Sequence, residues 1–277
     1  MLKINIHTHA HFKELGDISA IEEDILSDEI DYYVVAALDL HLHDGRTPED
    51  IEKMRKTGNR YSTHFYRFQD DTNENVASLR DQLGERIVPF AYIDPCKDNA
   101  LKEAEYWVKE RGFMGLKLYP PIGFYADDPD LLEFFQGVER LNVPVLFHMG
   151  RVLPHPKLRM KYARPMYLEG VAVNCPDLKI IVTHFARPWT YEAYCLALGF
   201  PNVYIDLTTG GSEDRVMIKR AIENLGAKRL AFGTDSIMNT EERFRKMREE
   251  FKKDDISDDD LDMILGGSAA EILGLNS

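Results

Sequence analysis

The sequence predicts a single-domain (β/α)8 barrel, the TIM-barrel architecture, over residues 1–277. Eight apolar runs of strand length alternate for the most part with segments of helical periodicity. The runs are nearly continuous in apolar residues, which is typical of strands buried on both faces of a parallel sheet. A length of 277 residues suits eight such units, and the chain has no repeat period or linker. A doubly wound open sheet is the alternative at this stage.

The N-terminal half begins with a short strand in which Ile4 and Ile6 alternate with polar neighbours. Isoleucines and leucines at helical spacing then predict a helix over 17–30. After the second strand, we expect an insertion or lid over 44–72, with a short helix from Pro48. The other elements expected in this half are strand 32–38, helix 73–83, strand 86–93, helix 99–111 and strand 114–119.

The C-terminal half alternates more regularly. The acidic run 254–260 lacks the spacing and the glycine of a calcium loop, so we interpret Ser257 as the cap of a helix with an acidic first turn. The elements expected here are helix 130–141, strand 144–148, helical segment 162–174, strand 179–184, helix 189–198, strand 203–207, helix 214–225, strand 229–235 and two final helices.

Composition limits the partners. A formal net charge of −13 argues against binding to nucleic acid or to an anionic membrane, because both need a positive face. The three cysteines, Cys96, Cys175 and Cys195, form no CxxC pair, as is usual in a reducing compartment. Because neither a signal peptide nor a membrane span is evident, we expect a cytoplasmic protein acting on a small molecule; a homodimer is left open.

Histidines gather at the predicted strand ends. His7 and His9 stand two apart, so a strand projects both imidazoles from one face. The alternative is a pair of ordinary histidines near a terminus. Side chains at the C-terminal ends of barrel strands converge on one site, which favours a metal centre. The polar residues at these ends are His7, His9, His41, His43, Lys117, His148, His184 and Asp235.

The side-chain types indicate the class of metal. Imidazoles with one carboxylate suit zinc, or iron, manganese or cobalt, whereas calcium prefers oxygen ligands. Three histidines and one aspartate leave a coordination position for water, as in catalytic zinc sites. Such a metal lowers the pKa of its water toward ~7, which makes a nucleophile available at neutral pH.

The motifs His7-Thr8-His9, Leu146-Phe147-His148, Val182-Thr183-His184 and Gly233-Thr234-Asp235, in this order, resemble the amidohydrolase superfamily. The stretch 115–120 (GLKLYP) and the C-terminal stretch 264–275 are similar to its amidohydrolase-related branch, although Ser268 stands where that branch usually has Asn. The branch also holds non-oxidative decarboxylases related to aminocarboxymuconate-semialdehyde decarboxylase.

The resemblance implies that His7, His9, His148 and Asp235 bind one zinc-type ion. It implies that His184 orients the water or polarises the substrate, and that Asp235 also receives the water's proton. Lys117 has two interpretations: a carbamylated bridge between two metals, as in binuclear members, or a lysine that pairs with acids or binds a substrate carboxylate. We favour one metal per chain.

Further side chains follow the same strand ends. Tyr119, Arg151 and Arg187 are candidates for substrate contact, since arginine suits a carboxylate. The function expected first is a hydrolase that uses metal-activated water on a small amide, lactone or ester. The alternatives are a metal-dependent decarboxylase of an unsaturated or aromatic acid, and a non-catalytic barrel that senses or binds a ligand.

Overall fold

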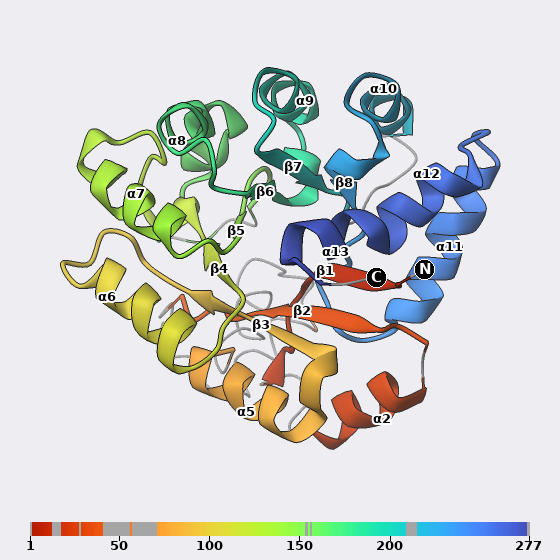
Figure 1. The fold of residues 1–277 in the computed structure, drawn as a ribbon, viewed down its shortest axis with the longest axis horizontal. Coiled ribbons are helices and arrows are strands. Elements are labelled where there is room, and N and C mark those ends of the chain that lie inside the picture. Colours follow the sequence, from red (N-terminus) through yellow and green to blue (C-terminus); the bar gives the residue numbers. More distant parts are fainter. Residues whose placement is uncertain are drawn as a thin grey trace.

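A computed structural model of the chain contains one eight-stranded parallel sheet in the order β1 to β8, surrounded by helices (Figure 1). Neighbours along the sheet are also neighbours in sequence, which confirms the barrel and excludes the doubly wound alternative. The structure describes residues 2–12, 18–27, 29–40, 56, 71–152, 155, 157–208 and 215–275.

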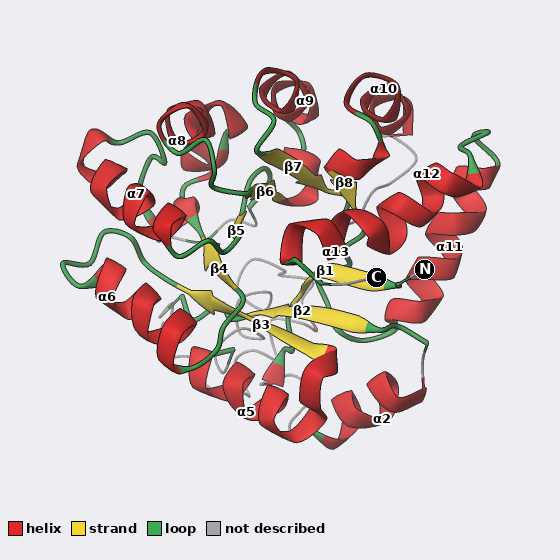
Figure 2. Cartoon of the chain, in the orientation of Figure 1, coloured by secondary structure: helices red, strands yellow, loops and turns green. Residues whose placement is uncertain are grey.

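The strands are short and the helices between them form the outer layer (Figure 2). The strands are β1 Ile4–Thr8, β2 Tyr32–Ala36, β3 Ile87–Tyr92, β4 Gly115–Leu118, β5 Val145–Phe147, β6 Ile180–Val182, β7 Val203–Asp206 and β8 Leu230–Ala231. The α-helices are α2 Ser19–Ser27, α5 Asn73–Leu83, α6 Ala100–Glu105, α7 Leu132–Arg140, α8 Glu169–Asn174, α9 Thr190–Gly199, α10 Arg215–Leu225, α11 Thr240–Lys252, α12 Asp258–Asp262 and α13 Ser268–Leu273.

Backbone hydrogen bonds join the first and last strands. The Ile6 N–H donates to the Phe232 carbonyl at 2.9 Å. The His7 carbonyl then accepts from the N–H groups of Thr234 at 3.1 Å and Asp235 at 2.9 Å. This seam brings the opening histidine motif against the loop that follows β8.

Two apolar clusters follow from the alternation of side chains along the strands. The inner cluster fills the barrel with Ile4, Ile6, Val34, Phe90 and Leu146, whereas the outer cluster packs the strands against the helices. Residues of α13 join the inner cluster. Lys179, directly before β6, donates from Nζ to two carbonyls of that helix, so α13 covers the end of the barrel where the strands begin.

An irregularity in β1 orients the histidines. Strict alternation from Ile4 and Ile6, which point into the barrel, would turn His7 outward. The pairing of β1 with β2 instead shifts between Asn5, opposite Tyr33, and Thr8, opposite Val35. This bulge inserts one residue and returns His7 and His9 to the barrel interior.

The predicted elements agree with the structure except at their ends. Helix 73–83 is confirmed as α5, and Ser257 accepts a hydrogen bond from the Asp260 N–H, as a helix cap does. The segment expected as helix 99–111 begins as α6 and continues as a π-helical turn, Tyr106–Glu110. Most of the predicted insertion or lid, with His41, His43 and Pro48, lies outside the described residues. Within the described residues, no helix has the length and apolar character needed to cross a membrane.

Candidate metal centre

His7 and His9 are held so that their Nε2 atoms meet. His7 Nδ1 lies 2.9 Å from Asp206 Oδ2, and His9 Nδ1 lies 2.7 Å from the Ala36 carbonyl oxygen. Each partner accepts a hydrogen bond, which places the ring proton on Nδ1 and the lone pair on Nε2. The two Nε2 atoms are 3.3 Å apart. Burial, with the nearby charge of Lys117, lowers the pKa of both imidazoles well below the usual value and keeps them neutral.

Asp235 adds a carboxylate to this pair. Its Oδ1 lies 3.4 Å from His7 Nε2 and 3.6 Å from His9 Nε2, while 30% of its side chain is exposed. The residue has a left-handed backbone (φ 62°), so the chain turns within the loop that follows β8. Three donor atoms, from His7, His9 and Asp235, thus lie within 4.8 Å of one another.

Asp206, at the end of β7, supports this group from behind. Its fully buried carboxylate accepts from His7 Nδ1, from the His184 N–H at 3.2 Å and from the Thr208 N–H at 2.8 Å. His7, His184 and Asp206 form a second group of three donors, but the hydrogen bond between Asp206 and His7 accounts for their proximity. Asp206 therefore orients the His7 ring and fixes its tautomer.

Lys117 reaches the same group from β4. Its side chain is fully buried, and its Nζ lies 3.1 Å from His7 Nε2. Burial lowers the pKa of this amine to about 8, although the charges of Asp235 and Asp206 oppose the shift. The amine is therefore still mostly protonated at neutral pH, and its neutral fraction grows as the pH approaches 8.

His148 and His184 complete the ring of imidazoles. Within the described residues, the buried Nε2 of His148 has no hydrogen-bond partner, and the ring bonds to the backbone of Arg151. Its centroid lies 5.0 Å from that of His184, which in turn lies 5.1 Å from that of His7. Burial is the main reason that the pKa of both imidazoles is lowered, so both are neutral. His148 is near the three-donor group but not part of it.

The predicted substrate residues differ in how they approach the centre. The Tyr119 ring packs on His148 with centroids 4.4 Å apart. Arg187 donates from its guanidinium to the Thr208 carbonyl at 3.2 Å, and its charge acts on His184. The Arg151 side chain is exposed. Tyr119 and Arg187 therefore lie beside the histidines of the centre. Arg151 is near them only through its backbone, which forms a hydrogen bond with the His148 ring.

Two residues at the centre, Asp206 and Thr208, are not among those predicted from the sequence. Asp206 ends an otherwise apolar run, at the same end of its strand as the histidines, and this position is the signal that identifies it. His11, which the sequence prediction leaves outside the ligand set, places Nε2 3.3 Å from the Asp235 carbonyl oxygen.

The chemistry of these donors fits a divalent metal ion. Two neutral imidazoles with facing Nε2 lone pairs repel each other unless a proton or a cation lies between them, and Asp235 adds negative charge there. The unpartnered Nε2 of His148 is a further imidazole donor beside them. Each His7 and His9 ring is anchored through its other nitrogen, as metal-binding histidines are.

Gly233 leaves the space that Asp206 and Thr208 occupy. A Cβ at this position would lie 2.2 Å from Asp206 Oδ1 and 2.5 Å from Thr208 Oγ1. We expect Gly233→Ala to displace the Asp206 carboxylate, to weaken metal binding and to lower the free energy of unfolding by about 1–3 kcal/mol. Denaturant unfolding and metal titration measure the two effects. Gly199→Ala, whose Cβ would meet nothing within 4 Å, is the matched control; equal behaviour of the two variants would contradict this role of Gly233.

Fold and site together define a barrel with a candidate metal centre at the C-terminal ends of its strands. The profile of the amidohydrolase family matches residues 6–275, so the chain belongs to that family. Membership points to an enzyme, and enzymes of this family typically depend on a divalent metal.

Three further comparisons agree with this assignment. The protein fluG of Emericella nidulans is 26% identical over 103 residues, which cover 35% of this chain and 12% of that protein. An uncharacterized TIM-barrel protein from Bordetella bronchiseptica has the same fold, with a TM-score of 0.73, 17% identity and 99% of each chain covered. A 2,6-dihydroxybenzoate decarboxylase superposes with a TM-score of 0.63 and 18% identity, over 100% of this chain and 99% of that one.

Proposed function

We propose that the protein is a metal-dependent hydrolase of a small amide, lactone or ester. The observation that carries the proposal is the meeting of two anchored Nε2 lone pairs with the Asp235 carboxylate, at the barrel end where active sites form. His7, His9 and Asp235 would hold one ion, zinc or another divalent transition metal, with His148 as the fourth ligand. When bound, the ion supplies a water of lowered pKa and polarises a carbonyl oxygen.

The surrounding residues handle protons and orientation. The Asp235 carboxylate is the base within reach of that water, and its partial exposure leaves a path for the proton. His184, neutral and fixed by the bond from its N–H to Asp206, presents an imidazole to the substrate carbonyl. Burial, the nearby Asp235 charge and Tyr92 raise the pKa of Tyr119, which keeps its hydroxyl protonated as a hydrogen-bond donor.

Decarboxylation of an unsaturated or aromatic acid is the second candidate. The fold shared with a 2,6-dihydroxybenzoate decarboxylase supports it. Hydrolysis is preferred because Arg187 donates to a backbone carbonyl and Arg151 is exposed, so neither arginine is dedicated to a substrate carboxylate at the centre.

A substrate panel tests the two reactions together. The zinc-loaded protein is incubated with lactones, amides, esters and aromatic carboxylates, while product acid and released carbon dioxide are both measured. We expect acid release from a lactone, amide or ester without carbon dioxide. Release of carbon dioxide from a carboxylate, with no hydrolysis of any lactone, amide or ester, would establish the decarboxylase instead. A folded protein that binds no transition metal would be a non-catalytic barrel, and would refute both enzymatic proposals.

The number of metal ions is tested at Lys117. The Lys117 amine contacts His7 Nε2 and is mostly protonated at neutral pH, and an ammonium has no lone pair for a second ion, which supports one equivalent per chain. Elemental analysis of protein purified without chelators is expected to give one equivalent in both the wild type and Lys117→Met, which keeps an unbranched side chain. Two equivalents in the wild type and fewer in the variant would favour a bridging, carbamylated lysine.

A further inference from the structure

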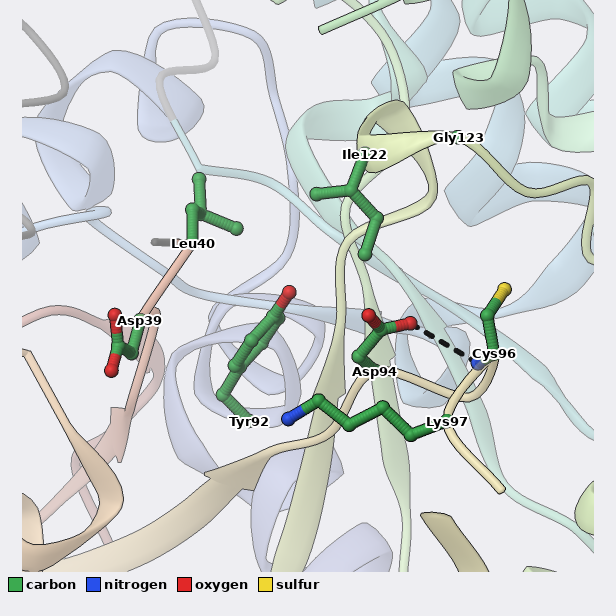
Figure 3. A pocket seen from close by; sticks show the side chains of 8 residues that line it. All are labelled: Asp39, Leu40, Tyr92, Asp94, Cys96, Lys97, Ile122 and Gly123. Carbon is green, nitrogen blue, oxygen red and sulfur yellow. Dashed lines mark hydrogen bonds between the residues drawn. The ribbon is translucent and has the colours of Figure 1, made fainter. Parts of the chain in front are cut away.

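A pocket of about 330 Å³ opens where β2, β3 and β4 end (Figure 3). Its lining comes from the segments that follow these three strands, so it lies on the same end of the barrel as the candidate metal centre. The residues that determine its character are Asp39, Leu40, Tyr92, Asp94, Lys97 and Ile122.

The pocket adjoins the metal centre through two neighbouring strands. Tyr92, the last residue of β3, is paired in register with Lys117 of β4, which contacts His7. Tyr119, the residue directly after β4, lies two positions beyond Lys117 and packs on His148. A small molecule with its reacting bond at the metal centre can therefore place its other end beside Tyr92.

Tyr92 presents an unused donor to this pocket. Its side chain is only 8% exposed, and the residues that the structure describes offer its hydroxyl no hydrogen-bond partner. Figure 3 shows the hydroxyl directed toward the space between Leu40 and Ile122. Burial, with the charges of Asp94 and Asp39, raises the pKa of the phenol, so it stays neutral. A hydroxyl that faces a pocket and has no partner among the described residues can form a hydrogen bond with a ligand there.

The charge around the Tyr92 ring is negative. The carboxylates of Asp39 and Asp94 lie on opposite sides of the ring in Figure 3. Asp94 Oδ1 accepts from the Cys96 N–H at 3.1 Å, which fixes the orientation of that carboxylate. Lys97 supplies the opposite charge, but its Nζ is 3.8 Å from Glu103, whose carboxylate offsets it. In Figure 3 the Asp39 carboxylate is turned away from the ring, so Asp94 is the carboxylate that faces it. An aromatic ring beside a fixed carboxylate favours a cation over an anion.

We propose that this pocket binds a positively charged nitrogen group of the substrate, an ammonium or a guanidinium. The inference rests on the proposed hydrolase function and narrows it to amides, lactones or esters of amine-bearing compounds. Asp94 accepts N–H bonds from the cation, Tyr92 offers its ring and its hydroxyl, and the Asp39 charge adds to the negative potential nearby. A substrate with a carboxylate at this end is disfavoured.

Two measurements on the zinc-loaded protein test the proposal. The first is calorimetric binding of benzylammonium and of benzoate. The second is kcat/KM for three esters that share one acyl centre and differ at a remote position, which carries an ammonium, a hydroxyl or a carboxylate. We expect benzylammonium to bind at least about tenfold more tightly than benzoate, and the ammonium ester to be hydrolysed about tenfold faster than the hydroxyl ester.

Asp94→Asn is the decisive variant, because asparagine keeps the acceptor for the Cys96 N–H and removes the charge. It should reduce several-fold the ratio of kcat/KM for the ammonium ester to kcat/KM for the hydroxyl ester. Asp98→Asn, the same change at an exposed position outside the pocket lining, should leave the preference intact. Tyr92→Phe separates the contribution of the hydroxyl from that of the ring.

The outcomes distinguish the pocket from the reaction. If the esters are hydrolysed with no preference for ammonium, or with a preference that Asp94→Asn does not alter, the pocket inference is overturned and the hydrolase stands. If benzylammonium binds, Asp94→Asn weakens that binding and no ester or amide is hydrolysed, the hydrolase proposal is wrong while the ligand class of the pocket is supported.

Discussion

Asp235→Asn is expected to lower kcat on the best substrate of the panel by about 10³-fold. The change removes the base that faces the two imidazoles and keeps the size of the side chain, so substrate binding should change much less. The left-handed backbone at this position also suits asparagine, which adopts it more readily than most residues. Steady-state kinetics and elemental analysis of the variant measure turnover and metal content separately.

The matched control for this change is Asp259→Asn, the same substitution at an exposed position on α12, which should leave kcat unaltered. Retained metal with lost turnover would indicate that Asp235 acts mainly as the base. Loss of both would indicate that its role as a ligand dominates. Wild-type turnover in Asp235→Asn would refute the role assigned to the carboxylate.

His9→Ala is expected to abolish the stabilisation that a divalent metal gives to the wild-type protein. A ligand at a hundred times its Kd raises the free energy of unfolding by about 2.7 kcal/mol. Removing one of the two facing Nε2 donors leaves an incomplete site, so the Tm of the variant should not respond to zinc or manganese. Thermal unfolding with and without each metal, after chelator treatment, measures the shift.

His155→Ala provides the comparison, because His155 lies outside the three-donor group and contacts the nearby backbone N–H of Lys157. Its metal-induced shift in Tm should match that of the wild type. A cooperative transition of the metal-free His9→Ala variant shows that it folds, which separates lost binding from misfolding. An undiminished shift in that folded variant would exclude His9 as a ligand.

The overall fold is predictable because its signals are local and repeated. Continuous apolar runs such as 179–184 give the buried strands, and the helical spacing and capping of 73–83 give the bounds of α5. Strand ends are less predictable. The run that ends at His184 stops being a strand at Val182, since His184 and Phe185 adopt left-handed backbones that hydrophobic pattern does not encode.

The candidate site is predictable as a set of strand-end residues but not as a geometry. The spacing of His7 and His9 predicts a shared face, yet the bulge that turns this face inward depends on the pairing of β1 with β2. Asp206 is not among the predicted site residues: its position at the end of an apolar run marks a strand-end carboxylate but does not show which side chains it contacts. Its role arises only from His7 and His184, which lie 199 and 22 residues away in sequence.

The seam between β1 and β8 has a consequence for biosynthesis. The carbonyl of His7 is paired with Thr234 and Asp235, so the imidazoles of His7 and His9 acquire their carboxylate partner only after more than two hundred further residues. During translation His7 and His9 are made before Asp235, so the three-donor group is incomplete until that residue is added. Closure of the barrel and completion of the metal centre are therefore the same late event, and a nascent chain that stops before β8 has neither.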